Sequence, residues 1–313
     1  MGKTAFLFPG QGSQAVGMGQ AFMEAYSVSK DVFTEADNRL DFELTKLIMN
    51  GPIETLTRTE NTQPALVTAS VAVLEALREK GITADYTAGH SLGEYSALVA
   101  SGSLSFSDAV FAVRNRGLYM EEAVPSGEGA MAAIMGMERE DLQQIVDDVS
   151  ASTATVQLAN LNSPGQIVIS GAKAGVEKAS EVAKENGARR IIPLQVSGPF
   201  HSSLMKPAAN KLSSILAGIE IKDASIPVIA NVTAEPSTSA TDIHDQLLKQ
   251  IYSPVLWEDT VRKLMDLGVD TFIEVGPGNV LSGLVKKVNR RAAVHAVATP
   301  EQLDQLIEKL GEE

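Results

Sequence analysis

A serine with the surroundings of an enzyme nucleophile stands near residue 90. The pentapeptide Gly-His-Ser-Leu-Gly at 89–93 matches Gly-x-Ser-x-Gly, the nucleophile elbow in which a strand turns sharply into a helix. Residues 84–88 can end a strand, and residues 94–100 read as a helix. Small flanking residues permit the strained turn, and the N–H groups of a helix start can stabilise an oxyanion. Ser91 is therefore the candidate nucleophile, with a chance match in a turn as the alternative.

A serine hydroxyl needs a base to accept its proton, and His201 is the best of the four histidines. It lies in the loop 197–202, where the chain returns from a predicted insertion, although a noncatalytic loop position stays open. His90 adjoins the serine, but neighbouring side chains at a sharp turn diverge, so packing is favoured for it. His244 reads as a solvated helix start and His295 as a half-buried strand residue.

No Asp or Glu stands out as a third member of a catalytic triad. A helix is predicted to end near Gln250, shortly before Pro254, which leaves carbonyl groups without partners inside the helix. Such a carbonyl can accept the N–H of a histidine and orient its ring.

The glycine-rich loop after the first strand has two interpretations. Gly10, Gly12 and Ala15 match the dinucleotide-binding fingerprint, but the second strand with its acidic end is missing from the expected place. The alternative is an oxyanion loop, in which the backbone N–H of Gln11 pairs with that of Leu92. A plain turn would also account for the glycines.

Arg116 lies in an apolar helical stretch, where a guanidinium needs a partner. The only acidic residue that closely precedes it at helical spacing is Asp108. The partner is therefore a substrate carboxylate, an internal ion pair or solvent.

The elements that must position these residues form an α/β pattern in two parts. Proline and glycine at 125–129 mark the clearest boundary. Beyond it the order is strand, helix, strand, strand, helix, strand, the ferredoxin-like pattern. We expect a core of residues 1–127 and 198–313 and a small subdomain at 128–197, with a cleft between them. Predicted core strands are 4–8, 226–232 and 271–275, and predicted helices include 21–40, 107–123 and 63–77, the last with Pro64 in its first turn.

Composition narrows the class of protein. The 313 residues are 44% hydrophobic, enough for a substantial core, and contain no cysteine, which excludes disulfides and thiolate chemistry. The net charge of −13 argues against general nucleic-acid binding. No signal peptide or membrane span is evident, so we expect a cytoplasmic protein that does not associate with membranes.

Motifs along the chain form a combination far more specific than any one of them. They are Phe-Pro-Gly-Gln-Gly-Ser-Gln at 8–14, Gly-His-Ser-Leu-Gly-Glu-Tyr at 89–95, Gly-Pro-Phe-His-Ser at 198–202 and Glu-Val-Gly-Pro-Gly at 274–278. In this order and spacing they resemble the malonyl-CoA:acyl carrier protein transacylase family over essentially the whole chain. The resemblance implies an α/β-hydrolase-like core with a parallel sheet and a ferredoxin-like insertion.

The resemblance also implies a ping-pong acyl transfer and the residues that carry it. Ser91 attacks the malonyl thioester, and His201 acts first as general base and then as general acid. The main-chain carbonyl of Gln250 orients His201. Backbone N–H groups of Gln11 and Leu92 hold the oxyanion.

Substrate binding falls, by the same resemblance, on Arg116, Phe200 and His90. Arg116 pairs with the malonyl carboxylate, and a buried Arg116 left unpaired would strongly penalise acetyl groups. Phe200 and Leu92 favour malonyl over methylmalonyl.

The implied acceptor is an acidic acyl carrier protein, so docking on this acidic chain needs a local basic patch. Lys286 and Lys287 lie in the densest basic run, and Arg189 with Arg190 forms a second one. We hypothesise that both line the mouth of the cleft, with solvated helix and strand ends as the alternative. We expect a monomer in fatty acid biosynthesis that needs no metal or other cofactor, malonyl-CoA and CoA being substrate and product.

Other functions remain open at this point. A serine hydrolase or thioesterase would share the elbow, an acyltransferase could serve a polyketide pathway, and a noncatalytic carrier-protein-binding module would not use Ser91.

Overall fold

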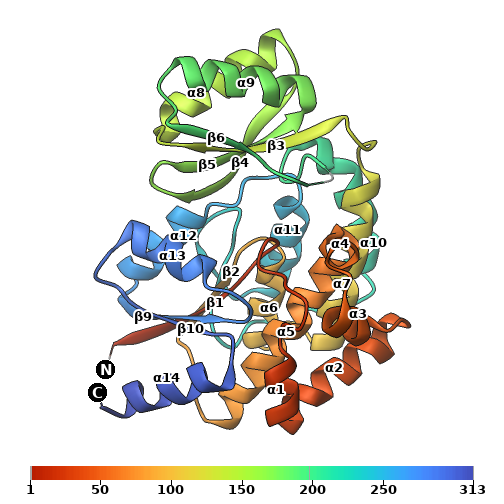
Figure 1. Cartoon of the computed structure of the whole chain (residues 1–313), viewed down its shortest axis with the longest axis vertical. Coiled ribbons are helices and arrows are strands. Elements are labelled where there is room, and N and C mark those ends of the chain that lie inside the picture. Colours follow the sequence, from red (N-terminus) through yellow and green to blue (C-terminus); the bar gives the residue numbers. More distant parts are fainter. Residues whose placement is uncertain (1, 197, 313) are drawn as a thin grey trace.

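The computed structural model describes residues 2–196 and 198–312, and its larger lobe contains a six-stranded sheet (Figure 1). The strand order is β10-β9-β1-β2-β7-β8, and all neighbouring pairs are parallel except β7 with β8. The predicted α/β class is confirmed. The strands are β1 (Lys3–Phe8), β2 (Tyr86–Gly89), β7 (Val228–Ile229), β8 (Pro236–Ser237), β9 (Val269–Val275) and β10 (Ala293–Val297).

Helices cover both faces of this sheet, as β1 illustrates. Phe6 and Phe8 belong to the apolar core on one face, whereas Ala5 and Leu7 belong to a second core on the other. Successive strand side chains point to opposite faces, so a continuous apolar run suits a strand covered on both sides. The first core contains side chains from α1 (Gln20–Ala25), α2 (Ser27–Leu40), α3 (Leu44–Asn50), α4 (Ile53–Thr57), α5 (Thr59–Glu79), α6 (Gly93–Ala100), α7 (Phe106–Glu122), α10 (Lys206–Leu216), α11 (Ala240–Gln250) and α14 (Pro300–Glu312), and the second contains side chains from α12 (Trp257–Asp266) and α13 (Val280–Val288).

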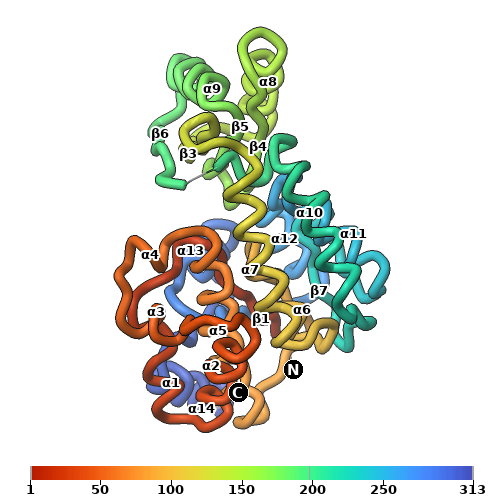
Figure 2. The backbone as a smooth tube through the Cα atoms, turned by 90° about the vertical axis from the view of Figure 1, so that its right-hand side faces the viewer, coloured from red at the N-terminus to blue at the C-terminus, as the bar shows by residue number. Residues whose placement is uncertain are grey.

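A four-stranded antiparallel sheet forms the small lobe, which projects from the large one (Figure 2). Its order is β4-β5-β3-β6, and helices α8 and α9 cover its outer face. On β3, Ala132 and Ile134 pack in this outer core, while Met131 and Ala133 join the core of the large lobe. The elements are β3 (Gly129–Met135), α8 (Arg139–Ser152), β4 (Val156–Ser163), β5 (Gln166–Ala172), α9 (Lys173–Glu185) and β6 (Arg190–Pro193), in the predicted order, and Ser197 at the end of the predicted insertion lies outside the described residues.

The two lobes are joined by backbone hydrogen bonds at Val255. Its N–H donates to Ala159 O at 2.8 Å, and its carbonyl accepts from Leu161 N at 2.9 Å. Val255 therefore pairs with β4 of the small lobe in parallel orientation, only a few residues beyond Gln250.

Helix α5 corrects the predicted position of Pro64. The helix begins at Thr59, so Pro64 lies inside it and cannot bond to the carbonyl of Glu60. Arg114 of α7 donates to that carbonyl at 2.5 Å and thereby satisfies the acceptor that proline leaves open.

Other boundaries also differ from the prediction. The expected strand at 226–232 is reduced to β7, and the expected helix at 21–40 is broken at Tyr26, whose backbone is extended. Helix α10 and strand β8 were not predicted. Among the described residues, no helix has the length and apolar character needed to cross a membrane.

The buried Glu274 at the end of β9 caps helix α13. Its carboxylate accepts from the N–H groups of Leu281 at 3.0 Å and Ser282 at 2.7 Å, in the first turn of that helix. Glu274→Ala leaves these donors unpaired, so we expect the free energy of unfolding to fall by about 1–3 kcal/mol in urea titrations. The exposed Glu177→Ala should change it by less than about 0.5 kcal/mol. Equal effects of the two variants would contradict the capping role.

Candidate active site

The segment between β2 and α6 has the backbone of a nucleophile elbow. Ser91 has a φ of 53°, in the left-handed region that side chains rarely adopt. A Cβ at Gly89 would overlap the backbone of Gly93, and a Cβ at Gly93 would overlap the carbonyl of Phe8. The turn therefore requires glycine at both positions and presents Ser91 at the start of α6.

Ser91, His201 and Gln250 form a hydrogen-bonded relay. Ser91 Oγ lies 2.8 Å from His201 Nε2, and His201 Nδ1 lies 2.8 Å from the main-chain carbonyl oxygen of Gln250. A carbonyl only accepts, so Nδ1 carries the proton and Nε2 is free to accept one from Ser91. This is the geometry the sequence predicted, with a carbonyl in place of an acid.

His201 is buried, with 4% of its surface exposed. Burial above all, and the neighbouring Arg116 cation next, lower the pKa of His201 to about 3. The imidazole is therefore neutral at physiological pH and available as a base.

Arg116 of α7 reaches the same point from another helix. Its Nη2 lies 3.1 Å from Ser91 Oγ and 2.9 Å from Gln250 Oε1, and its Nη1 lies 2.7 Å from Gln63 Oε1. The side chain is buried, and burial lowers its pKa, while the nearby acidic groups of Tyr95 and Glu94 act in the opposite direction. Within the described residues, neutral amide oxygens hold the guanidinium, so it is neither in an internal ion pair nor exposed, two of the alternatives left open by the sequence. Gln63 is a site residue that sequence reasoning missed.

These partners change one expectation about Arg116. Both of its terminal nitrogens have acceptors within the protein, and among the described residues only Nε is buried without one. A noncarboxylated acyl group therefore does not leave the guanidinium fully unpaired, so the penalty against acetyl is smaller than the sequence argument predicted.

A cavity of about 110 Å³ opens beside Ser91. His90 also lines it, with its Nε2 2.8 Å from Asn162 Oδ1 and its ring 5.4 Å from that of Trp257. His90 thus has packing partners and faces the cavity as well. The other lining residues are Gln11, Gln63, Arg116, Met120, Met131, Asn160, Leu194, Val196, Phe200 and His201.

The predicted oxyanion donors are Gln11 and Leu92. Gln11 lines the cavity, and Leu92 is the N-cap residue of α6, directly after the serine. Within the described residues, neither backbone N–H donates to a protein acceptor. Their pairing around an oxyanion stays a prediction.

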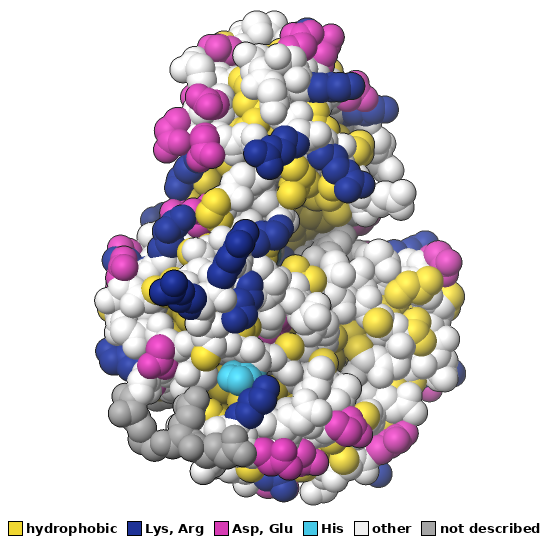
Figure 3. All heavy atoms as spheres, turned by 60° about the vertical axis from the view of Figure 1, so that its left-hand side comes forward, with side chains coloured by type: hydrophobic (Ala, Val, Ile, Leu, Met, Phe, Trp, Pro, Cys, Tyr) yellow, Lys and Arg dark blue, Asp and Glu magenta, His cyan; other side chains and the backbone are white. Residues whose placement is uncertain are grey.

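The basic residues predicted to bind a carrier protein are exposed, and none lines the cavity. Lys286 Nζ donates to the carbonyl of Ala292 at 2.6 Å, and Lys287 Nζ donates to Gln166 Oε1 of the small lobe at 2.5 Å. Arg190 is the first residue of β6, and Arg189 directly precedes it. Figure 3 shows Lys and Arg side chains gathered on one face, around the narrowing between the lobes.

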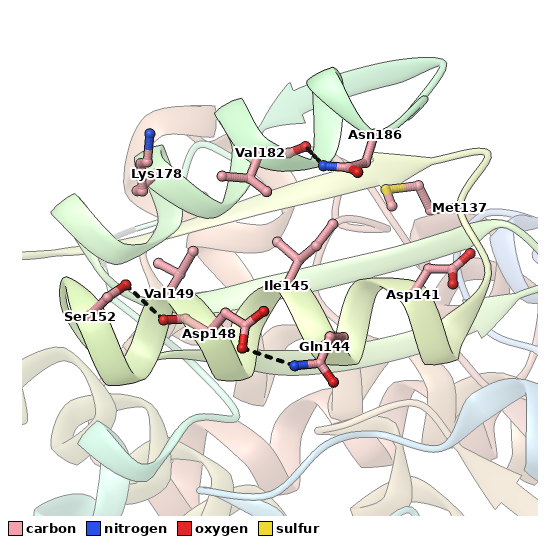
Figure 4. A pocket seen from close by; sticks show the side chains of 10 residues that line it. All are labelled: Met137, Asp141, Gln144, Ile145, Asp148, Val149, Ser152, Lys178, Val182 and Asn186. Atoms are coloured by element: carbon pink, nitrogen blue, oxygen red, sulfur yellow. Dashed lines mark hydrogen bonds between the residues drawn. The ribbon is translucent and has the colours of Figure 1, made fainter.

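A larger hollow of about 590 Å³ lies between α8 and α9 on the outer side of the small lobe (Figure 4). Asp141 and Asp148 line one side and Lys178 the other. It contains none of the residues predicted to do chemistry, so the smaller cavity at Ser91 is the candidate active site.

An elbow serine that is hydrogen-bonded to a histidine and lies beside a buried arginine, on an α/β fold, is the arrangement expected of enzymes that acylate a serine. The chain belongs to the acyl transferase domain family, which matches residues 5–310, and it is an acyltransferase.

The chain is similar to known transacylases over nearly its whole length, both in sequence and in structure. The chain is 60% identical to the malonyl CoA-acyl carrier protein transacylase of Bacillus subtilis strain 168, over 100% of this chain and 99% of that protein. The crystal structure of an acyl carrier protein S-malonyltransferase from Vibrio cholerae superposes with a TM-score of 0.95 at 45% identity, covering 97% of this chain and 99% of that one. A malonyl-transacylase in complex with its type II PKS acyl-carrier protein has a TM-score of 0.95 at 43% identity, covering 98% and 99%.

Proposed function

We propose that this protein transfers the malonyl group from malonyl-CoA to the phosphopantetheine thiol of an acyl carrier protein, through a malonyl ester of Ser91, in fatty acid biosynthesis. The observation that carries the proposal is the position of Arg116. Its guanidinium lies within hydrogen-bond distance of the nucleophile itself, at 3.1 Å. An acyl group bearing a carboxylate would meet this cation as its thioester reaches Ser91.

The first half of the reaction forms the malonyl-serine ester. Ser91 Oγ attacks the thioester carbonyl while His201 Nε2 takes its proton, and the N–H groups of Gln11 and Leu92 hold the oxyanion. When the C–S bond breaks, His201 returns that proton to the sulfur and CoA leaves as a thiol. The carbonyl of Gln250 keeps the ring in position throughout.

The second half runs the same steps with a new thiol. His201 accepts the proton of the carrier protein's thiol, whose sulfur attacks the Ser91 ester, and Ser91 leaves with the proton returned. Arg116, Phe200 and His90 hold the malonyl group in both halves. No metal or redox cofactor takes part in this scheme.

The remaining assignments support the same function. We infer that the large lobe, residues 1–127 and 198–313, is an α/β-hydrolase-like core, and that residues 128–197 form a ferredoxin-like subdomain. The small sheet's order, β4-β5-β3-β6, supports the latter. The carrier protein docks on Lys286, Lys287, Arg189 and Arg190, and the protein acts as a cytoplasmic monomer.

Intact-mass spectrometry tests the function directly. Brief mixing with malonyl-CoA should add one malonyl group to the protein, and addition of holo carrier protein should remove it and malonylate the carrier. Steady CoA release without an adduct or a malonylated carrier would instead identify a hydrolase. Neither adduct nor release would leave a binding module.

The depressed pKa of His201 gives a pH prediction. An ordinary histidine, with a pKa of about 6.5, is mostly protonated by about pH 5 and cannot act as a base. His201, with its pKa at about 3, stays neutral there. We expect kcat/KM for malonyl-CoA to keep its base-form value as pH falls from about 8 to 5, and to be lost only towards about pH 3.

Glu94 supplies the control for this profile, because burial raises its pKa to about 7. Any inflection near neutral pH that disappears in Glu94→Gln belongs to Glu94. A tenfold loss for each pH unit below about 6.5, in both proteins, would contradict the assignment to His201.

A further inference from the structure

Two amide side chains hold the backbone of the nucleophile. The N–H of Ser91 donates to Asn231 Oδ1 at 2.7 Å, and the carbonyl of Ser91 accepts from Gln250 Nε2 at 2.9 Å. Ser91 is the residue with the strained φ of 53°. A distant side chain thus holds each polar group of its backbone, and the backbone N–H of Glu94 is a second, local donor to the Ser91 carbonyl at 3.1 Å.

Asn231 has a second contact with the same turn. Its Nδ2 donates to the carbonyl of Gly89 at 2.7 Å, so one side chain spans the elbow from the residue before His90 to the residue after it. Strand β7 runs parallel to β2, with Ile229 beside Ala88, and this pairing brings Asn231 next to the turn that follows β2. The side chain is buried, which excludes water as a ready substitute.

Glu94 contacts both Gln250 and Asn231, and the two amide side chains also lie 3.5 Å apart, from Gln250 Nε2 to Asn231 Oδ1. Glu94 Oε2 accepts from Gln250 Nε2 at 2.7 Å and from the backbone N–H of Asn231 at 3.2 Å. A carbonyl only accepts and an arginine only donates, so Gln250 must turn Nε2 towards the Ser91 carbonyl and Oε1 towards Arg116 at 2.9 Å. In this orientation the Nε2 group also faces Glu94, which accepts from it.

The hydrogen bonds to the Ser91 backbone determine which N–H group can bind an oxyanion and where the Ser91 hydroxyl points. Because its N–H is already bonded to Asn231, Ser91 does not contribute that group to an oxyanion hole, and the next N–H along the chain, that of Leu92, is the one left free. The direction of Oγ towards His201 depends on the φ of Ser91, which the bonds to its N–H and carbonyl hold.

We propose that Asn231 is a positioning residue that holds Ser91 in its reactive conformation, with Glu94 as the anchor that joins Asn231 to Gln250. The inference rests on the proposed role of Ser91 as nucleophile. It concerns the reactivity of the serine itself, not the recognition of malonyl.

The test compares malonylation with a reaction that needs no malonyl group. A fluorophosphonate phosphonylates an activated serine, forming an O–P bond at Ser91 Oγ while fluoride leaves and the proton is released. For Asn231→Ala we expect both the malonylation rate and the phosphonylation rate to fall by a similar factor, on the order of tenfold to a hundredfold. The KM for malonyl-CoA should stay within about threefold, because Arg116 and the cavity are retained.

Thr233→Ala is the matched control. Thr233 lies on the same loop, exposed, and its Oγ1 accepts only from the N–H of Glu235, at 3.3 Å. It should match wild type in both rates. If Asn231→Ala stays within about twofold of this control in phosphonylation, the inference is overturned. If Asn231→Ala loses its cooperative thermal transition, Asn231→Ser, whose side chain is too short to reach both backbone groups, is judged by the same limits.

The anchor is tested by two changes at Glu94. Glu94→Gln can keep an acceptor oxygen in place and should retain phosphonylation within about threefold, whereas Glu94→Ala should lower it at least about tenfold. Equal phosphonylation of these two variants would remove Glu94 from the proposal. A wild-type protein that is phosphonylated but never malonylated would refute the proposed function while leaving the positioning of Ser91 measurable.

Discussion

Replacing Ser91 with alanine is expected to abolish the malonyl adduct and to lower transfer to the carrier protein by a factor on the order of 10⁴ or more. The reason is that Ser91 supplies the one hydroxyl among the described residues that line the cavity. His201 would keep its bond to the Gln250 carbonyl but would have no hydroxyl to deprotonate. Intact mass and the rate of carrier malonylation are the two measurements.

Ser96→Ala is the control for this change. Ser96 lies on α6, five residues after Ser91, and its buried hydroxyl has no hydrogen-bond partner in the part of the chain that the structure describes. Its loss should leave the adduct and the transfer rate within about threefold of wild type. A malonyl adduct on Ser91→Ala would mean that another residue carries the acyl group.

Arg116→Ala is expected to cost about 2–5 kcal/mol of transition-state stabilisation with malonyl-CoA and so to lower kcat/KM, because truncating one partner of a buried charge pair usually has a cost of this size. The corresponding loss is roughly thirtyfold to several thousandfold. The rate with acetyl-CoA should change far less, because Gln63 and Gln250 already satisfy the guanidinium when no carboxylate is bound. The ratio of malonyl to acetyl transfer should therefore collapse.

Arg114→Ala is the matched control for the selectivity. Arg114 lies two residues away on α7 and contacts Glu60 O and Asn61 Oδ1 instead of the cavity. Its loss should reduce stability, because the Glu60 carbonyl loses its partner, while the malonyl-to-acetyl ratio stays the same. An unchanged ratio in Arg116→Ala would contradict the clamp and favour an esterase for neutral substrates.

The sequence predicts the residues that do the chemistry better than the residues that hold them in place. Ser91 and His201 stand in local motifs whose backbone geometry follows from neighbouring residues. Gln63 does not. It reaches Arg116 only because α5 and α7 approach closely at Gly117, where a Cβ would press against the backbone at Glu60. Such a contact between residues far apart in the chain depends on packing that local patterns do not encode.

Strand β7 shows the same limit. The apolar run 226–232 predicts a long strand, but the chain turns back after Ile229, and the N–H of Ala230 donates to the carbonyl of Glu235 at 3.1 Å. The residue that follows, Asn231, is therefore released from the sheet and able to bond to the elbow. A pattern of hydrophobicity predicts burial, which is correct here, but not the point at which pairing stops.

The backbone pairing at Val255 has a consequence for motion. The segment that follows the Gln250 carbonyl is hydrogen-bonded into the sheet of the small lobe, so a hinge between the lobes would pull on the group that orients His201. Closure over a substrate would thus cost the relay its alignment. We therefore expect the cleft to keep its width through both half-reactions, so that CoA and the carrier's prosthetic arm enter the same opening in turn.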